Sequence, residues 1–180
     1  VYVGKQAFGS TNLTDLYYNI PHLTNRGGLT YTEAFQNMGN GGFKNITIGN
    51  DVKILTDCVF TEQKAVETIV IPDSVEIIGT SAFKNCTSLK NLTISDSVTE
   101  IGVEAFDGCT SLTEFTVPKS VKVLGKNAIP KTVTIVYFNA ENCEFYYPDN
   151  ENISPFVESS IEKVLIGDTV KRIPDYFFSN

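Results

Sequence analysis

The chain has 180 residues, of which 42% are apolar, so it is long and apolar enough to form one packed domain or one repeat array. Its formal net charge of −7, with only 14 lysines and arginines, argues against binding to the phosphate backbone of a nucleic acid. No apolar run approaches the roughly 18 residues that a membrane-spanning helix needs.

The first 45 residues contain one predicted strand and one long coil. Val3-Gly4 and Ala7-Phe8 match positions of the repeats further along, so the chain begins within a repeat. Residues 16–18 are the first predicted strand. Residues 19–45 form a coil longer than the repeats that follow, and its proline and glycines predict a loop that bulges outward.

A repeat of fixed period occupies the centre of the chain. Ile69-Val-Ile-Pro-Asp-Ser-Val-Glu-Ile-Ile-Gly79 aligns with Leu92-Thr-Ile-Ser-Asp-Ser-Val-Thr-Glu-Ile-Gly102, and the same offset recurs at the positions that follow. The clearest repeats are 46–68, 69–91, 92–114 and 115–132, and Pro130 cuts the last one short. A constant offset of this size indicates a solenoid, in which each repeat is one coil.

The remaining residues contain another long coil. We expect a strand at residues 133–135, a long coil at 136–163 and a seventh strand at 164–166. The chain ends at Asn180 with its coil unfinished. We therefore expect a single domain, residues 1–180, that is a fragment of a longer solenoid cut within a repeat at both ends.

Within one coil, apolar residues two apart predict a strand with alternate residues inward, followed by a return leg. Small and large residues next to each other, as at Ala82-Phe83, would share one core layer. Glycine after the return leg predicts a tight or positive-φ conformation there. The repeat positions expected to carry this structure are Ile69, Ile71, Val75, Ile78, Gly79, Ala82, Phe83, Cys86, Leu89, Leu92, Ile94, Val98, Ile101, Gly102, Ala105, Phe106, Cys109 and Leu112.

The repeat resembles the BspA-like leucine-rich repeat of bacterial cell-surface proteins. The resemblance rests on Leu-x-x-Leu-x-Ile at residues 89–94 and on Ser-Val-x-x-Ile-Gly-x-x-Ala-Phe-x-x-Cys-x-x-Leu at residues 74–89. It implies a β-rich solenoid of about seven coils, with a parallel β-sheet on one face and little helix. It also implies a secreted or cell-surface protein, and family members have been linked to adhesion to host matrix proteins or to other cells. No binding residues carry over, because the motif is structural.

The outward-facing residues of the predicted sheet are the first candidates for binding. A solenoid face can bind an extended partner, but threonine also suits a solvated strand that has no ligand. The predicted outward row is Tyr17, Thr47, Val70, Thr93, Thr116, Thr134 and Leu165. The row beside it, at the turn, is Asn19, Gly49, Pro72, Ser95, Pro118, Val136 and Gly167.

Aromatic residues of the long coils are the second candidates, since exposed aromatic side chains make good contacts. The alternative is that they fill coils too wide for isoleucine and leucine. These residues are Tyr31, Tyr137, Tyr146 and Tyr147.

Catalysis and metal binding have little support in the sequence. The only histidine is His22, and no nucleophile, zinc or phosphate-loop motif is present. The four cysteines match no metal-binding spacing. Cys86 and Cys109 share one repeat position and are expected to be buried thiols, with a disulfide between adjacent coils as the alternative. We expect no cofactor and no metal.

The sequence therefore favours a non-catalytic extracellular module of a surface or secreted protein, which contacts an unidentified protein or glycan, possibly of a host matrix or cell surface. It predicts no nucleic-acid partner and no membrane insertion. The alternative function is a structural spacer in a multidomain surface protein.

Overall fold

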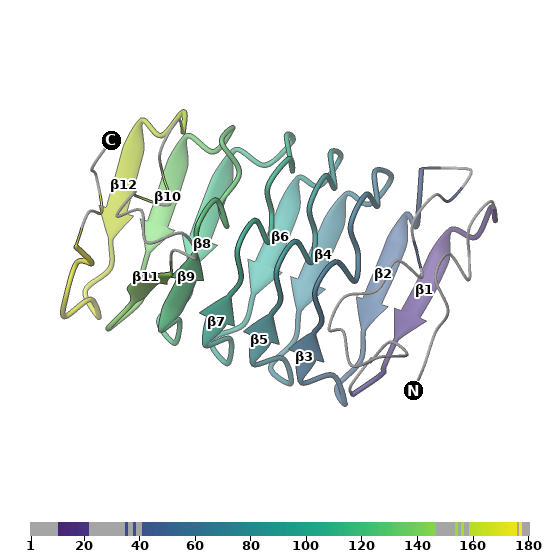
Figure 1. Cartoon of the computed structure of the whole chain (residues 1–180), viewed down its shortest axis with the longest axis horizontal. Helices are drawn as coiled ribbons and strands as arrows, with labels where there is room; N and C mark the ends of the chain where they lie inside the picture. Colours follow the sequence, from purple (N-terminus) through teal and green to yellow (C-terminus); the bar gives the residue numbers. More distant parts are fainter. Residues whose placement is uncertain are drawn as a thin grey trace.

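The computed structural model describes residues 11–21, 35, 38, 41–146, 154, 156, 159–175 and 177. Over these residues the chain winds into a stack of coils whose strands lie side by side like rungs (Figure 1). All strand pairs recorded among them are parallel, and the described part of the chain contains no helix. The predicted β-rich solenoid is confirmed.

Each coil contributes a longer strand to one side of the stack, and, among the described residues, the coils that begin at β2, β4, β6, β8 and β10 also contribute a shorter strand to another side. The longer strands form what we call the front ladder: β1 (Asp15–Tyr18), β2 (Asn45–Ile48), β4 (Thr68–Ile71), β6 (Asn91–Ile94), β8 (Glu114–Val117), β10 (Ile135–Phe138) and β12 (Lys163–Ile166). The shorter strands form the back ladder: β3 (Ile54–Leu55), β5 (Ile77–Ile78), β7 (Glu100–Ile101), β9 (Val123–Gly125) and β11 (Glu144–Tyr146).

The two ladders differ in continuity. The back ladder is unbroken from β3 to β11. The front ladder is divided into three hydrogen-bonded groups, which are β1-β2, β4-β6 and β8-β10-β12. Figure 1 shows the same three groups of arrows along the front of the stack.

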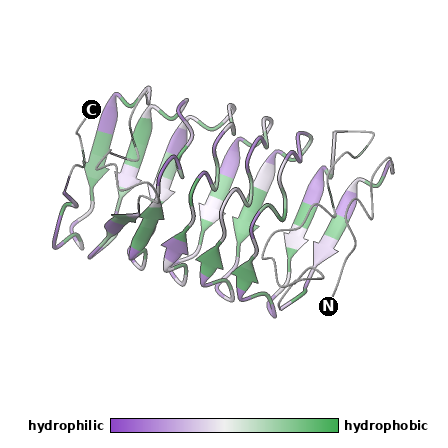
Figure 2. Cartoon of the chain, viewed as in Figure 1, coloured by the Kyte–Doolittle hydropathy of each residue, from purple (hydrophilic) through white to green (hydrophobic). Residues whose placement is uncertain are grey.

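The front strands share an apolar residue at every second, inward position, which matches the two-residue period of a strand. In β4, Ile69 and Ile71 are buried while Thr68 and Val70 are exposed. Hydrophobic and hydrophilic residues alternate along β2 and β8 (Figure 2). One set of side chains therefore enters the core and the other faces solvent.

The core is a column of aromatic and aliphatic layers between the ladders. Phe60, Phe83 and Phe106 stack from coil to coil, with ring centroids 5.4 and 5.2 Å apart. Tyr18 extends the column, with its ring 5.2 Å from that of Phe60. The predicted repeat positions are buried as expected, except Leu92, Ile94 and Gly102, which are half-buried.

Strand register fixes the length of each coil, because paired residues occupy the same place in successive coils. In the regular part of the stack Ile69 pairs with Leu92. The coil between Leu16 and its partner Ile46 is longer than this repeat, and so is the coil between Val136 and its partner Val164. The presence of two coils longer than the repeat is therefore confirmed.

The predicted strand at residues 133–135 is wrong. The front strand at this point is Ile135–Phe138, and its Val136 pairs with Phe115. The N–H of Val133 donates to the carbonyl of Pro130, as that of Leu112 donates to Cys109, so Val133 occupies the position of Leu112 ahead of the strand. Pro130 therefore shortens this coil only slightly relative to the repeat.

Of the two reasons predicted for the repeated glycines, a tight conformation or positive φ, positive φ is wrong. Gly79, Gly102 and Gly125 do not have positive φ. A Cβ on Gly79 would lie 2.8 Å from the carbonyl oxygen of Leu55, and one on Gly102 would lie 2.6 Å from the amide nitrogen of Thr80. Glycine is required because the backbone of the preceding coil passes too close for a side chain.

Positive φ instead occurs two residues after each of these glycines, at non-glycine residues. Ser81, Glu104 and Asn127 have φ of 54°, 55° and 54°. Each lies one repeat after the previous one, beginning at Cys58 with φ of 57°. The coil corner therefore holds ordinary side chains in the left-handed region, which is tolerated only where surrounding contacts enforce it.

Substitution of Gly102 by alanine tests the close backbone approach. The added methyl has no room, and relief requires the two coils to separate, so we expect a loss of about 1–3 kcal/mol in the free energy of unfolding. Urea denaturation measures it. Thr113→Ala, at an exposed position, is the control and should change stability by less than about 0.5 kcal/mol. Equal stability of the two variants would refute the steric explanation.

Candidate binding face

The outward residues of the front ladder lie in one row across the coils. Register pairs Tyr17 with Thr47, and Val70 with Thr93. Tyr17 is 68% exposed and Val70 is 55% exposed, which is unusual for side chains of this size. We call this set the outward row; its members in the structure are Tyr17, Thr47, Val70, Thr93, Thr116, Tyr137 and Leu165.

Thr134 does not belong to the outward row, contrary to the prediction. Tyr137 pairs with both Thr116 and Leu165 and takes that place. The carbonyl of Thr134 accepts the N–H of Lys163 at 3.0 Å, which puts Thr134 at the leading edge of the ladder. The error follows from the misplaced strand, and it left an aromatic residue near one end of the face out of the predicted row.

A second row lies beside the outward row, where each front strand enters its turn. We call it the turn row: Asn19, Gly49, Pro72, Ser95, Pro118, Asn139 and Gly167, each of which directly follows its front strand. Asn139 stands where the sequence placed Val136, for the same reason as above. Neither row contains a charged residue, although 19% of the chain is charged. Within the front strands, charged residues occur only at the leading edge, at Asp15, Glu114 and Lys163.

The front ladder is interrupted at two junctions, each of which holds a cavity. The first opening, between β2 and β4, has a volume of about 390 Å³ and is lined by Asn45, Ile46, Thr47, Ile48, Thr68, Val70 and Pro72. The second opening, between β6 and β8, has a volume of about 290 Å³ and is lined by Lys90, Asn91, Leu92, Thr93, Glu114, Phe115 and Thr116. The second opening explains why Leu92 is half-buried.

The position of each opening follows from a proline in the turn row. At the paired junctions the turn-row residue donates its N–H to the preceding coil: Gly49 to Tyr18 at 2.8 Å, Ser95 to Ile71 at 3.2 Å, Asn139 to Val117 at 3.1 Å and Gly167 to Phe138 at 2.9 Å. Proline has no N–H to donate. Pro72 and Pro118 stand at the two junctions that are open.

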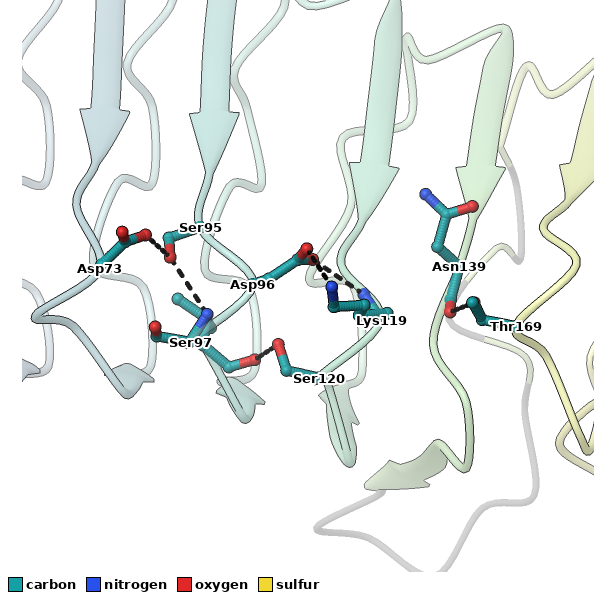
Figure 3. A network of polar contacts seen from close by, with 9 residues as sticks. Asp73, Ser95, Asp96, Ser97, Lys119, Ser120, Asn139 and Thr169 are labelled. Carbon is teal, nitrogen blue, oxygen red and sulfur yellow. Dashed lines mark hydrogen bonds and ion pairs between the residues drawn. The ribbon is translucent and has the colours of Figure 1, made fainter.

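Side chains at the turns connect coils beyond the ends of the front strands (Figure 3). The Ser95 hydroxyl donates to the Asp73 carboxylate. The Asp96 carboxylate accepts from the Lys119 ammonium at 3.0 Å and from the Lys119 N–H at 3.4 Å. The pair of Asp96 and Lys119 spans the second opening where β6 and β8 enter their turns. The turn edge therefore stays connected where the strands do not.

The aromatic residues proposed from the long coils are not gathered in one place. Tyr137 lies in β10 and is half-buried, and Tyr146 lies in β11 of the back ladder and is 55% exposed. Tyr31 and Tyr147 lie outside the described residues. Of the two residues of this group that the structure describes, Tyr137 alone belongs to the front ladder.

Cys86 and Cys109 are free and buried, as the sequence predicts. The Cys86 thiol donates to the carbonyl of Phe60 at 3.2 Å, and the Cys109 thiol donates to that of Phe83 at 3.1 Å. Burial raises the pKa of Cys86 well above its usual value, and the neighbouring Cys109 adds to the effect. Both thiols are packing elements, and the Cys86 thiol stays protonated near neutral pH.

The described residues contain no cluster of three or more histidine, cysteine or acidic side chains able to hold a metal ion. His22 lies outside the part of the chain that the structure describes. A search of the same part of the chain for a helix long and apolar enough to cross a membrane finds none. The geometry that the structure does offer is an extended sheet face with two uncharged rows and two openings.

Comparison with known proteins identifies the repeat and the fold. Residues 30–148 match the model of the BspA type leucine rich repeat region, in six copies. A leucine rich cell surface protein from Faecalibacterium prausnitzii superposes with a TM-score of 0.62 at 17% identity, over 92% of this chain and 51% of that protein. The leucine rich repeat protein of T. pallidum gives 0.62 at 23% identity, over 81% and 66%.

The pneumococcal vaccine antigen PcpA is also similar, with a TM-score of 0.56 at 20% identity, over 97% of this chain and 52% of that protein. This chain thus spans about half to two thirds of the length of the three structures. No curated protein sequence matches it.

Buried phenol and thiol groups predict a loss of stability in alkali. Burial raises the pKa of Cys143 from 9.0 to about 12, with a smaller contribution from Glu144, and burial raises the pKa of Tyr18 from 10.0 to about 12. Between pH 9 and about 12 the unfolded chain therefore binds fewer protons than the folded chain. The free energy of unfolding should be unaffected by these groups below pH 9 and should fall progressively as pH rises to about 12.

Urea denaturation at pH 8, 9, 10 and 11 measures this loss. Cys143→Ala removes one of these groups, so its stability should fall less steeply over this range than that of the unaltered chain. The matched control is Thr113→Ala, whose pH dependence should equal that of the unaltered chain. Identical slopes for all three proteins would contradict the assignment to Cys143.

Proposed function

Because this chain belongs to the family of BspA-type leucine-rich repeat proteins, we propose that it is a non-catalytic extracellular module that binds a protein or glycan through the front ladder. Two of the similar structures are described as a leucine rich cell surface protein and as a vaccine antigen, which supports a position at the cell surface. Adhesion to a host or neighbouring cell is the activity that fits such a position.

The observation that carries the proposal is the absence of charge from two adjacent rows on an acidic protein. Seven rungs about 4.8 Å apart make a face roughly 30 Å long. The centres of protein interfaces are depleted in charged residues and enriched in aromatic ones. The outward row shows this composition, with Tyr17, Val70, Tyr137 and Leu165 among its members and charges confined to the edges.

The alternative is a spacer that holds another domain away from the cell surface. Thr47, Thr93 and Thr116 favour it, because β-branched polar residues solvate an exposed strand without a ligand. The two functions differ in one outcome: a spacer of this kind does not depend on the chemistry of the outward row.

An adherence assay separates them. Fluorescent beads coated with the full chain are applied to cultured epithelial cells, and retained beads are counted after washing. The double variant Thr93→Lys and Thr116→Lys places two charges in the uncharged row, and we expect retention to fall roughly tenfold or more, because an uncompensated charge in an interface costs several kcal/mol.

The control carries the same substitutions away from the front ladder, at the exposed positions Thr80 and Thr110. It should retain beads as well as the unaltered chain, and both double variants should melt at similar temperatures. Retention unaffected by the change at Thr93 and Thr116, or no retention of the unaltered chain, would exclude binding to these cells through this face.

A further inference from the structure

Each opening in the front ladder is walled by peptide groups that have no partner across it. At a paired junction, the N–H of Ser95 points back to Ile71, and peptide groups alternate sides along a strand. The N–H and C=O groups of Thr68 and Val70 therefore face β2, and those of Ile46 and Ile48 face β4. No hydrogen bond between described residues joins β2 to β4 or β6 to β8. The same geometry leaves Leu92 and Ile94 opposite Glu114 and Thr116.

Contacts elsewhere in the stack fix the spacing between the two walls of each opening. Beside the first opening, the Gly79 N–H donates to Leu55 at 2.8 Å on the back ladder, and the Ser74 hydroxyl donates to Gly49 at 3.3 Å at the turn. Beside the second, the back ladder joins Ile101 to Leu124, and Lys119 contacts Asp96. The openings are thus preformed, so an incoming group does not have to order their walls.

We infer that the two openings, rather than the threonines of the outward row, are the positions where the front ladder takes groups of its partner, and that these groups are carboxamides of asparagine or glutamine side chains. The inference rests on the proposed function and names the chemistry of the same face. A carboxamide carries both donors and an acceptor, as a peptide group does. Its N–H groups donate to the carbonyl of Ile48, which Pro72 cannot reach with an N–H, and to that of Ile94, for which Pro118 likewise has none.

Charge and size select the carboxamide. Every residue lining the first opening is uncharged, so a carboxylate or an ammonium group there has no counter-charge. The second opening has one lysine and one glutamate in its lining, Lys90 and Glu114, so its formal charge is zero, and Lys90 is already paired with Glu67 at 3.4 Å. β2 and β4 remain within 8 Å of each other, whereas inserting a whole strand between them requires about 9.6 Å, twice the strand spacing. Cavities of about 390 and 290 Å³ accommodate one side chain each.

Titration with acetamide, followed by ¹⁵N–¹H NMR of the full chain, tests the inference. We expect saturable shifts of the amide signals of Thr68, Val70, Glu114 and Thr116, with dissociation constants on the order of 1–100 mM for so small a molecule. Acetate and isopropanol are the matched probes for a carboxylate and a hydroxyl, and neither should shift these signals. Shifts of equal size with either probe, or no shift with acetamide, would overturn the carboxamide assignment.

Proline substitutions close the openings one at a time. Ser95 shows that serine at this position allows a paired junction, so Pro72→Ser should abolish acetamide shifts at Thr68 and Val70 and leave those at Glu114 and Thr116. Pro118→Ser should do the reverse. The reciprocal variant Ser95→Pro should create new acetamide shifts at Asn91 and Thr93, because a third opening forms between β4 and β6. Acetamide shifts that persist when the corresponding proline is replaced would refute the assignment.

The adherence assay separates this inference from the proposed function. The double variant Pro72→Ser and Pro118→Ser should lose bead retention while keeping the charge and outward row intact. If it retains beads and Thr93→Lys with Thr116→Lys does not, the face binds without the openings and the inference is wrong. If the lysine variant also retains beads, the front ladder is not the binding face, even if acetamide shifts the amide signals at the openings.

Discussion

Hydrogen bonding between successive coils is the constraint on which this structure depends. A single coil buries too few side chains to be stable alone, so each coil relies on the next for its backbone partners and for its core contacts. The register that pairs Ile69 with Leu92 aligns the strands, and the same register stacks Phe83 on Phe106 at 5.2 Å. It also brings the backbone of one coil against Gly102 in the next. Strand pairing, core packing and the choice of glycine are thus consequences of one repeat length.

Because the repeat length determines strand pairing, core packing and the glycine positions, the sequence predicts the central coils well. Every inward position between Ile69 and Leu112 could be read from spacing alone, since stacking demands the same residue type at the same place. The strand Ile135–Phe138 could not be predicted from spacing, because Pro130 interrupts the pattern. The length of the shortened coil is set by hydrogen bonds such as that from the Val133 N–H to the Pro130 carbonyl. The role of the glycines was misread for a similar reason: a close backbone approach leaves no mark in one coil considered by itself.

The members of the outward row were predicted in outline and missed in detail. Six of its seven outward residues follow from the repeat, but Tyr137 was placed in a long coil because its strand was misplaced. The openings depend on a missing N–H, and a pattern of side chains does not record a missing backbone donor. Pro72 and Pro118 were nevertheless visible in the turn row, and asking which residues there could donate a hydrogen bond would have indicated both openings. The departures from the repeat, more than the repeat itself, give this face its individual chemistry.

The unequal continuity of the two ladders gives the stack a directional mechanical compliance. Bending that spreads the front strands is resisted by peptide hydrogen bonds at the junctions of Gly49, Ser95, Asn139 and Gly167, but at the two proline junctions the strands themselves offer no such resistance. At these two junctions the stack bends about the unbroken back ladder. Curvature changes should therefore be concentrated between β2 and β4 and between β6 and β8, and the three groups of front strands should move as rigid plates when the solenoid is pulled or pressed against a surface.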